Sequence, residues 1–355
     1  MHACTTRPTD LGSSLRDWAG TDPTRGALAA TIETIAATSA AQAGALRLAG
    51  LRGYHDDSTG TNADGDRQRR VDVDAHDAFV AALATAPVAA LASEEAEGIL
   101  PLTPGAPLLV AIDPLDGSAN LAVDGPVGMI FSIRPAPTER EATAEDFLSA
   151  GTTQLGAGIV LFGPATMLAL TVGEGTDVYA FDDVAGCFSR IHQRVQTPTG
   201  TREFAINSSN SRHWSPAMRS YITDLIEGAD GPRQADFNMR WFGALVADAY
   251  RILLRGGVFL YPDDGRAGYS CGRLRLVYEA QPIAMLFEQS GGAATDGSRR
   301  ILELTAGHLH ARTPLVFGSA DKVARVARYR ELVGNDPERA PLFGIRGLFR
   351  EGSER

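Results

Sequence analysis

Lysine is nearly absent from this chain of 355 residues, and Lys322 is the single example. Arginine supplies the other basic side chains, and acidic residues outnumber basic ones by 43 to 33, which gives a formal net charge of −10. A nucleic acid or an anionic membrane surface needs clustered basic residues, so this balance argues against both as partners. If the protein binds an anionic ligand, arginines and metal ions must supply the local positive charge.

Cysteines and long apolar runs are also scarce. Cys4, Cys187 and Cys271 form no C-x-x-C pair, and an odd count of three fits a reducing compartment better than a disulfide framework. No apolar run reaches the length of about 18 residues that a membrane span needs. Residues 1–7 lack the apolar core of a signal peptide. These absences predict a cytoplasmic protein without a membrane partner.

The length allows one large domain or two of ordinary size, and 44% hydrophobic residues suffice for a sizeable core. Helical and strand-like patterns alternate along the chain, which predicts an α/β fold. The short polar stretch 198–202 is a candidate domain boundary. We therefore expect a flexible N-terminus, two domains and a tail, which cover residues 1–22, 23–200, 201–335 and 336–355.

Hydrophobic periodicity predicts most of the secondary structure. Residues 24–48 carry apolar side chains at helical spacing, and Gly50 follows where a helix C-terminus favours glycine. Short apolar runs between Gly/Asp turns predict an antiparallel meander over residues 156–190. Further predicted helices cover residues 72–86, 216–228, 242–253 and 281–289, and further predicted strands cover residues 88–91, 107–112, 127–133, 203–206, 258–261, 274–278 and 315–317.

Residues 113–120, with the sequence D-P-L-D-G-S-A-N, directly follow the predicted strand 107–112. The proline cannot donate to a strand ladder, and the glycine permits a tight turn. Asp113 and Asp116 can therefore place hard oxygen ligands in one small space, as Mg²⁺ requires. If the backbone amides of residues 117–119 open a helical turn, they form an anion cradle beside the cation. An ordinary Asp/Gly/Ser turn is the alternative, and this motif alone does not exclude it.

A second pair of acids occupies an equivalent position. The predicted strand 88–91 is followed by Ser93, Glu94 and Glu95. If the two strands are neighbours, their carboxyl ends bring four carboxylates together. Each like-charge pair at ~4 Å costs on the order of 1 kcal/mol in water, and more near a protein surface. A divalent metal ion is the simplest way to offset this repulsion, so the two motifs together favour a metal site.

These motifs, S-E-E and D-P-L-D-G-S-x-N, resemble those of the class 1 fructose-1,6-bisphosphatases of the lithium-sensitive phosphatase superfamily. The resemblance continues in register from residue 25 to about residue 330, and several long motifs in one order are more specific than any single motif. Its other segments are 62–66 (N-A-D-G-D), 204–207 (F-A-I-N), 240–248 (R-W-F-G-A-L-V-A-D), 257–262 (G-V-F-L-Y-P) and 273–279 (R-L-R-L-V-Y-E).

The resemblance implies a layered α+β sandwich with two domains that assembles into a homotetramer. It implies hydrolysis of the 1-phosphate of fructose 1,6-bisphosphate to fructose 6-phosphate and phosphate, in gluconeogenesis or the Calvin cycle. The cofactor would be Mg²⁺, with two or three ions per subunit that Mn²⁺ can replace. The metal ligands would be Glu94, Asp113, Asp116, Glu279 and the backbone carbonyl of Leu115.

The resemblance also implies the catalytic and substrate-binding residues. Glu95 and Asp72 would accept the proton of the attacking water, and Asp66 would join a metal ion when the catalytic loop 50–72 closes. The sugar bisphosphate would contact Asp116, Gly117, Ser118, Ala119, Asn207, Arg240, Tyr261 and Arg273.

Two positions depart from the family pattern at the end of the pocket away from the metal ions. Trp241 and Asn210 stand where the family has tyrosines, and neither side chain copies the geometry of a phenol. A bifunctional enzyme that also hydrolyses sedoheptulose 1,7-bisphosphate is therefore an open alternative. Another sugar phosphatase of the superfamily, such as inositol monophosphatase, is a weaker alternative because its W-D-x-A-A-G segment is absent.

The positions that bind the inhibitor AMP in the family also differ. They read Arg25, Ala27 and Ala29 near the start of the first long helix, and Pro107-Leu108 replaces a lysine-tyrosine pair. Alanine, proline and leucine side chains offer no hydrogen bond or charge to a nucleotide. The sequence therefore predicts weak inhibition by AMP.

Overall fold

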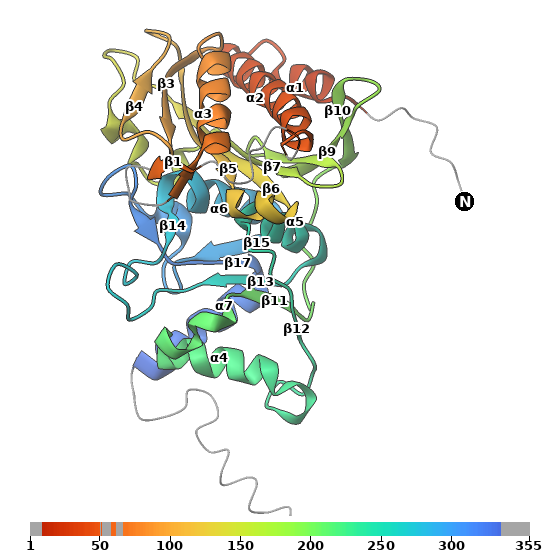
Figure 1. Cartoon of the computed structure of the whole chain (residues 1–355), viewed down its shortest axis with the longest axis vertical. Coiled ribbons are helices and arrows are strands. Elements are labelled where there is room, and N and C mark those ends of the chain that lie inside the picture. Colours follow the sequence, from red (N-terminus) through yellow and green to blue (C-terminus); the bar gives the residue numbers. More distant parts are fainter. Residues whose placement is uncertain (1–8, 50, 52–57, 62–66, 335–355) are drawn as a thin grey trace, which may run out of the picture.

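The computed structural model describes residues 9–49, 51, 58–61 and 67–334, and it stacks helices and sheets in alternating layers (Figure 1). An eight-stranded sheet and a five-stranded sheet have helices on both outer faces and between them. The predicted layered α+β fold is therefore confirmed. Among the described residues, no helix combines the length and the hydropathy of a membrane span.

The larger sheet has the strand order β10-β9-β8-β7-β6-β5-β3-β4. Its last four strands along the chain form the antiparallel meander that the sequence predicts. Only β3 and β5 are parallel neighbours within it. The strands are β3 (Val88–Ser93), β4 (Ile99–Pro101), β5 (Leu108–Asp116), β6 (Val127–Pro135), β7 (Gly156–Phe162), β8 (Thr166–Thr171), β9 (Thr176–Asp182) and β10 (Cys187–His192).

Three helices, α1 (Leu11–Ala19), α2 (Pro23–Arg47) and α3 (Arg70–Leu83), cover the outer face of this sheet. α2 confirms the predicted helix 24–48, and the Asp22 carboxylate caps it by accepting the N–H groups of Thr24 and Arg25. A two-stranded hairpin, β1 (Ser58–Thr61) and β2 (Arg67–Arg69), precedes α3.

The expectation of a flexible segment over residues 1–22 is wrong for α1. Asp10 caps this helix by accepting the N–H of Ser13 at 2.8 Å, and Leu11 and Leu15 are buried against the sheet core. The helix has only 9 residues, so its apolar positions recur too few times to produce a clear period in the sequence.

The smaller sheet has the order β12-β11-β13-β17-β15, and its first three strands are parallel. α5 (Leu245–Arg255) and α6 (Gln281–Gln289) lie between the two sheets, and α4 (Pro216–Ile226) and α7 (Ala320–Gly334) lie on the outer side. The strands are β11 (Glu203–Ile206), β12 (Asn238–Met239), β13 (Val258–Tyr261), β15 (Gly292–Thr295) and β17 (Leu315–Ser319), with a separate pair of β14 (Leu274–Arg275) and β16 (Arg312–Thr313).

Short helical turns complete the described chain. They are the 3₁₀ turns η2 (Ser118–Val123), η3 (Ala144–Phe147), η4 (Gly151–Thr153), η5 (Ser208–His213), η6 (Gly228–Asp230) and η8 (Ile301–Glu303), and the π-helical turn η7 (Leu276–Ala280).

The predicted strand 274–278 is half wrong, because it ends at Arg275 and the chain continues as η7 directly into α6. All five residues of η7 are buried, so the turn has no exposed face. Without the contrast between a buried and an exposed face, the sequence shows no helical period that would distinguish this turn from a strand. π-helical turns of this kind are frequent at functional sites.

The predicted domain boundary 198–202 falls between β10 and β11, the last strand of one sheet and the first of the other. However, α5 and α6 pack on both sheets, and Ile130 of the first half shares a core with Ala249 and Ile283 of the second. The division into two domains therefore stays a prediction.

Candidate active site

β3 and β5 end side by side, and acidic residues follow or terminate each strand. The parallel register places Ser93 opposite Ile112. The N–H of Glu94 donates to the carbonyl of Ile112 at 3.1 Å, so the turn after β3 is tied to β5. The two predicted strands are thus neighbours, as the pairing of their acids requires.

Three carboxylates converge at this edge of the sheet, Asp113 and Asp116 from β5 and Glu279 from η7, and one oxygen of each lies within 4.8 Å of the others. Their exposed fractions are 5%, 9% and 6%. The segment after β14 therefore contributes from the second half of the chain to a cluster that begins in the first half.

Burial raises the pKa of all three carboxyl groups. For Asp113, burial comes first, and the charges of Glu94 and Asp116 then raise the pKa further. Burial and the Glu94 charge also hold the pKa of Glu279 well above its usual value. Burial raises the pKa of Asp116 to about 6. Buried oxygen donors that resist ionisation by themselves suit a hard divalent cation, which would stabilise their charged forms.

Arg275 is a part of this site that the sequence reasoning missed. Its side chain is 2% exposed, and its Nε lies 3.6 Å from Oε1 of Glu94. Its backbone N–H donates to the Glu279 carboxylate. In the sequence, the only sign of a buried positive charge at this site is the alternation of arginine and leucine in residues 273–276. A strand at the edge of a sheet would show the same alternation.

The D-P-L-D segment differs from the expected turn. β5 continues through it to Asp116, with an irregular register against β6 between Asp113 and Asp116. The N–H of Leu115 donates to Oδ1 of Asp113 at 3.0 Å, and Leu115 is buried. A bulge of this kind re-aims side chains without ending the strand, which explains how both aspartates reach one cluster.

Gly117 follows the strand in a left-handed conformation with φ of 75°. A Cβ at this position would lie 2.5 Å from the Cβ of Ala244, so only glycine fits. The close approach brings β5 to the start of α5, where the N–H of Val246 donates to Oδ2 of Asp116 at 2.7 Å.

Residues 117–119 do open a helical turn, η2, as the anion-cradle prediction requires. The Ser118 carbonyl accepts a hydrogen bond from Nη1 of Arg69 at 3.0 Å, and Ala119 is exposed. Nδ2 of Asn120 donates to the carbonyl of Phe242 at 3.1 Å, which ties this turn to the segment before α5.

Of the residues predicted to handle the proton, Asp72 lies on α3 and Glu95 lies in the turn after β3. Asp72 is in the first turn of α3, where its carboxylate accepts the N–H of Arg69 at 2.9 Å, and burial raises its pKa. Glu95 is half-buried and directly follows Glu94. Asp66, the third predicted member of this group, lies outside the described residues.

His76 is a second residue that the sequence reasoning missed. Its Nδ1 shares a hydrogen bond of 2.8 Å with Oγ of Ser93, and this oxygen accepts a long hydrogen bond of 3.4 Å from the N–H of Glu95. Burial lowers the pKa of His76, which favours the neutral ring. His76 stands four residues after Asp72, which places both side chains on one face of α3. This spacing was the feature of the sequence that could have identified His76.

The predicted sugar-phosphate residues follow the carboxyl ends of adjacent parallel strands. Arg240 comes directly after β12, Asn207 after β11, and Tyr261 ends β13. Arg240 is exposed, and the other two are half-buried. Carboxyl ends of parallel strands meet at one edge, so these residues share an edge of the smaller sheet, where α/β proteins commonly bind ligands.

Trp241, at a position where the resemblance implies a tyrosine, packs beside this edge. Its ring stacks on Phe259 with centroids 5.6 Å apart, and the Tyr261 ring lies 6.1 Å away. Arg273, from the segment before β14, lies with its Cζ 4.6 Å from the Tyr269 ring centroid.

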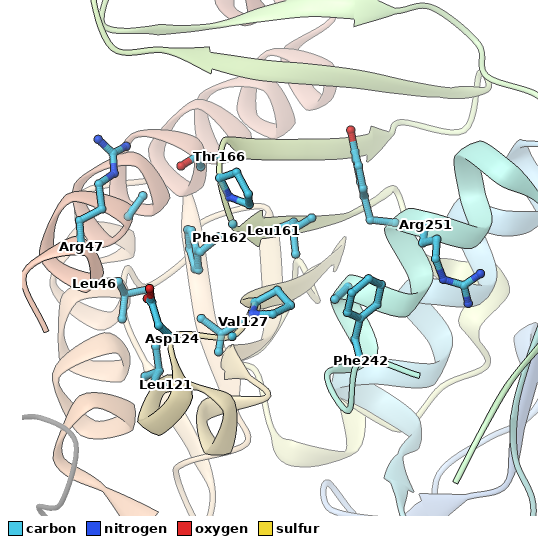
Figure 2. Close-up of a pocket in the computed structure, with 17 residues that line it drawn as sticks. Leu46, Arg47, Leu121, Asp124, Val127, Leu161, Phe162, Thr166, Phe242 and Arg251 are labelled. Atoms are coloured by element: carbon cyan, nitrogen blue, oxygen red, sulfur yellow. The ribbon is translucent and has the colours of Figure 1, made fainter. Parts of the chain in front are cut away.

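A cavity of about 650 Å³ lies on another part of the surface, between the end of α2, η2 and the start of α5 (Figure 2). Its wall is mostly apolar and contains none of the predicted site residues. Two arginines reach it, but Arg47 pairs with Asp183, and Arg251 pairs with Glu203 and Asp248. The cavity therefore lacks an uncompensated charge for an anionic ligand.

The layered sheets and the buried acids at their strand ends define an α/β protein with a candidate divalent-metal site shared by both halves of the chain. Residues 19–193 match the family model described as "Fructose-1-6-bisphosphatase, N-terminal domain", and residues 197–331 match the model of the C-terminal domain.

Comparisons with individual proteins agree. The chain is 49% identical over 345 residues to the class 1 fructose-1,6-bisphosphatase of Rhodopseudomonas palustris strain BisA53, covering 96% of this chain and 98% of the relative. It is 50% identical over 345 residues to the Methylorubrum populi protein of the same name, with the same coverage. The crystal structure of Leishmania major fructose-1,6-bisphosphatase in holo form is similar with a TM-score of 0.85 and 33% identity, covering 92% of this chain and all of that one. The chain therefore belongs to the fructose-1,6-bisphosphatase family.

Proposed function

We propose that this protein hydrolyses the 1-phosphate of fructose 1,6-bisphosphate and releases fructose 6-phosphate and phosphate. The observation that carries the proposal is the cluster of Asp113, Asp116 and Glu279, whose oxygens lie within 4.8 Å of one another in a buried site. The names of the relatives supply the substrate, and the family supplies the expectation of a metal-dependent enzyme.

The residues of the cluster fit a divalent cation. Carboxylate and carbonyl oxygens are the ligands that Mg²⁺ prefers, so we assign the metal to Glu94, Asp113, the Leu115 carbonyl, Asp116 and Glu279. Two or three Mg²⁺ ions per subunit are proposed, with Mn²⁺ as a substitute. Such ions supply Lewis-acid stabilisation of phosphoryl oxygens and lower the pKa of a bound water.

The chain's own groups perform the remaining tasks. Glu95 and Asp72 accept the proton of the attacking water, and the raised pKa of Asp72 brings it nearer to the operating range of a general base. The amides of residues 117–119 bind phosphoryl oxygens. Asp66 assists when the loop 50–72 is closed.

The 6-phosphate, called the far phosphate because it lies away from the reacting group, would bind at the edge of the smaller sheet. We assign its contacts to Asn207, Arg240, Tyr261 and Arg273, because guanidinium groups bind phosphate with paired hydrogen bonds. Arg240 is exposed at this edge and is proposed to reach the sugar phosphate of a neighbouring subunit in a homotetramer. We also propose that the enzyme is cytoplasmic and that it acts in gluconeogenesis or the Calvin cycle.

Phosphate release from a panel of substrates tests the proposal. We expect rapid release from fructose 1,6-bisphosphate with Mg²⁺, no release after chelation of the metal, and little release from fructose 6-phosphate or inositol monophosphate. Equal activity with and without Mg²⁺, or a preference for inositol monophosphate, would contradict the proposal.

A further inference from the structure

The segment between β13 and β14 is an ordered loop rather than a simple connection. The N–H of Tyr269 donates to the carbonyl of Arg266 at 3.0 Å, and the N–H of Gly272 donates to the carbonyl of Tyr269 at 3.0 Å. The N–H of Gly265 donates to the carbonyl of His213 at 3.1 Å, and Asp264 forms a bridge with Trp214. The loop is therefore fastened to the end of η5, the element that Asn207 begins.

Arg266 is held firmly within this loop. Its Nε lies 3.0 Å from Oδ1 of Asp264, its Nη2 also contacts that carboxylate, and its backbone N–H donates to Oδ1 at 3.0 Å. These hydrogen bonds lower the pKa of Asp264. The Arg266 charge is thus compensated, and its guanidinium has a fixed position.

The Tyr269 ring contacts two guanidinium groups. Cζ of Arg266 lies 4.4 Å from the ring centroid, and Cζ of Arg273 lies 4.6 Å from it. Both distances are well within the ~6 Å range of cation–π attraction. The ring therefore lies against Arg266, which pairs with Asp264, and also against Arg273.

Arg273 differs from Arg266 in its charge balance. Among the described residues, no carboxylate forms a salt bridge with Arg273, and its guanidinium contacts the Tyr269 ring. A guanidinium that is placed by an aromatic ring keeps its hydrogen-bond donors available for an anion.

The Tyr269 ring and its two arginines belong to the chain segment that connects Tyr261 to Arg275. Arg275, two residues after Arg273, reaches Glu94, whose charge acts on Asp113 and Glu279 of the acidic cluster. The pKa of Arg266 is raised mainly by its hydrogen bond to Asp264 and further by the nearby phenols of Tyr269 and Tyr261. The loop that carries these residues begins directly after Tyr261, which ends β13 and is one of the proposed contacts of the 6-phosphate.

We propose that Tyr269 is a positioning residue that holds the Arg273 guanidinium ready for the substrate phosphate that is not hydrolysed. The inference rests on the proposed function and adds a determinant of substrate recognition to it. Without the ring, the long arginine side chain samples many rotamers, and binding has to restrict them. Tyr269 acts through Arg273 and not on the reacting phosphate.

The test compares two substrates in the full-length protein. Fructose 1,6-bisphosphate carries the far phosphate, and fructose 1-phosphate has the same reacting group without it. For Tyr269→Leu we expect the KM of the bisphosphate to rise about fivefold while kcat stays within about twofold. The KM of fructose 1-phosphate should not change. Tyr269→Phe, which keeps the ring, should behave like the parent, as should Ser270→Ala, an exposed neighbour.

A double-mutant cycle sharpens the test. In an Arg273→Ala background, Tyr269→Leu should add no further increase in KM, because the ring acts only through that arginine. Equal KM increases for both substrates, a fall in kcat of the same size, or additive effects of the two substitutions would overturn the proposal.

Failure of the proposed function has a separate signature. If the parent protein releases no phosphate from fructose 1,6-bisphosphate, that function is wrong whatever the variants do. Titration calorimetry of the same sugar phosphates then still compares the parent with Tyr269→Leu. Weaker binding of the bisphosphate alone would support the role of Tyr269, and unchanged binding would contradict it.

Discussion

The two ends of the candidate site are built in opposite ways. At the acidic end, Asp113, Asp116 and Glu279 are each less than 10% exposed and raise one another's cost of ionisation. At the sugar-phosphate end, Arg240 is exposed and Asn207 is half-buried. A buried cluster depends on every member, whereas exposed side chains on separate loops contribute independently. We therefore expect all-or-none effects at the first end and graded effects at the second.

Asp116→Asn should give the largest effect, a loss of turnover of about 10³-fold or more, because a charged metal ligand is lost while the shape is nearly kept. Asp124→Asn is the matched control, since this exposed aspartate lies in the next turn with a φ of 54° that asparagine also tolerates. Circular dichroism should report a folded protein in both cases. Activity of Asp116→Asn within tenfold of the parent at saturating Mg²⁺ would remove Asp116 from the metal site.

A longer substrate should give a smaller, graded effect at the far end. Trp241 packs on Phe259 and Tyr261 and offers no phenol hydroxyl to the sugar, and the exposed Arg240 has a long side chain that can adjust. We expect kcat/KM for sedoheptulose 1,7-bisphosphate within ~100-fold of the fructose value, a difference in activation free energy below about 2.7 kcal/mol. Steady-state kinetics on both sugars measure this ratio, and a ratio above 10⁴ would mark a dedicated six-carbon enzyme.

The pH dependence of metal binding tests the burial of the acidic end. The pKa of Asp116, about 6, lies above its usual 3.8, so between these values the folded metal-free protein holds more protons than the unfolded chain. Its free energy of unfolding should therefore fall as the pH rises through this window. Mg²⁺ needs the ionised carboxylate, so its affinity should weaken by about tenfold from pH 7 to pH 5 for this one proton.

Calorimetry at the two pH values, with thermal unfolding of the metal-free protein alongside, provides the measurement. Equal Mg²⁺ affinity at pH 5 and pH 7 would show that the carboxylates ionise normally. It would also remove the contrast between the two ends.

AMP should have the smallest effect, less than about twofold at millimolar concentration, because the matching positions offer few free polar groups. Arg25 is already occupied: its Nη1 donates to the Trp18 carbonyl at 3.2 Å, and its guanidinium pairs with Glu174 at 3.4 Å. Ala27 and Ala29 have no polar side chain. Inhibition at micromolar AMP would show that other residues form a nucleotide site.

The sequence predicted the acidic end better than the far end for a physical reason. An apolar run followed at once by paired acids is a local signal, and it occurs after residues 88–91 and after residues 107–112. That the two strands are neighbours was an assumption made from the sequence, and the structure shows that they pair in parallel. The bulge at Asp113–Asp116 and the π-helical turn that carries Glu279 are responses to tertiary packing, which a single buried run of residues does not encode.

The far end depends on contacts between distant segments. Asn207, Arg240 and Tyr261 share an edge only because β11, β12 and β13 are parallel, and no local pattern specifies that order. The contact of Tyr269 with Arg266 and Arg273 was also invisible, because a loop rich in Gly and Asp predicts a turn but not which rings and charges meet. α7 was missed as well. The role of Asp66 stays a prediction.

Locating the metal ion tests the central claim most directly. Crystals grown with Mn²⁺ would reveal the ion by anomalous scattering, and activity with Mn²⁺ in solution would accompany the measurement. Our account predicts a peak among the carboxylates of Asp113, Asp116 and Glu279 and the loss of that peak in Asp116→Asn. A peak elsewhere, or full activity with no ion at these carboxylates, would contradict it.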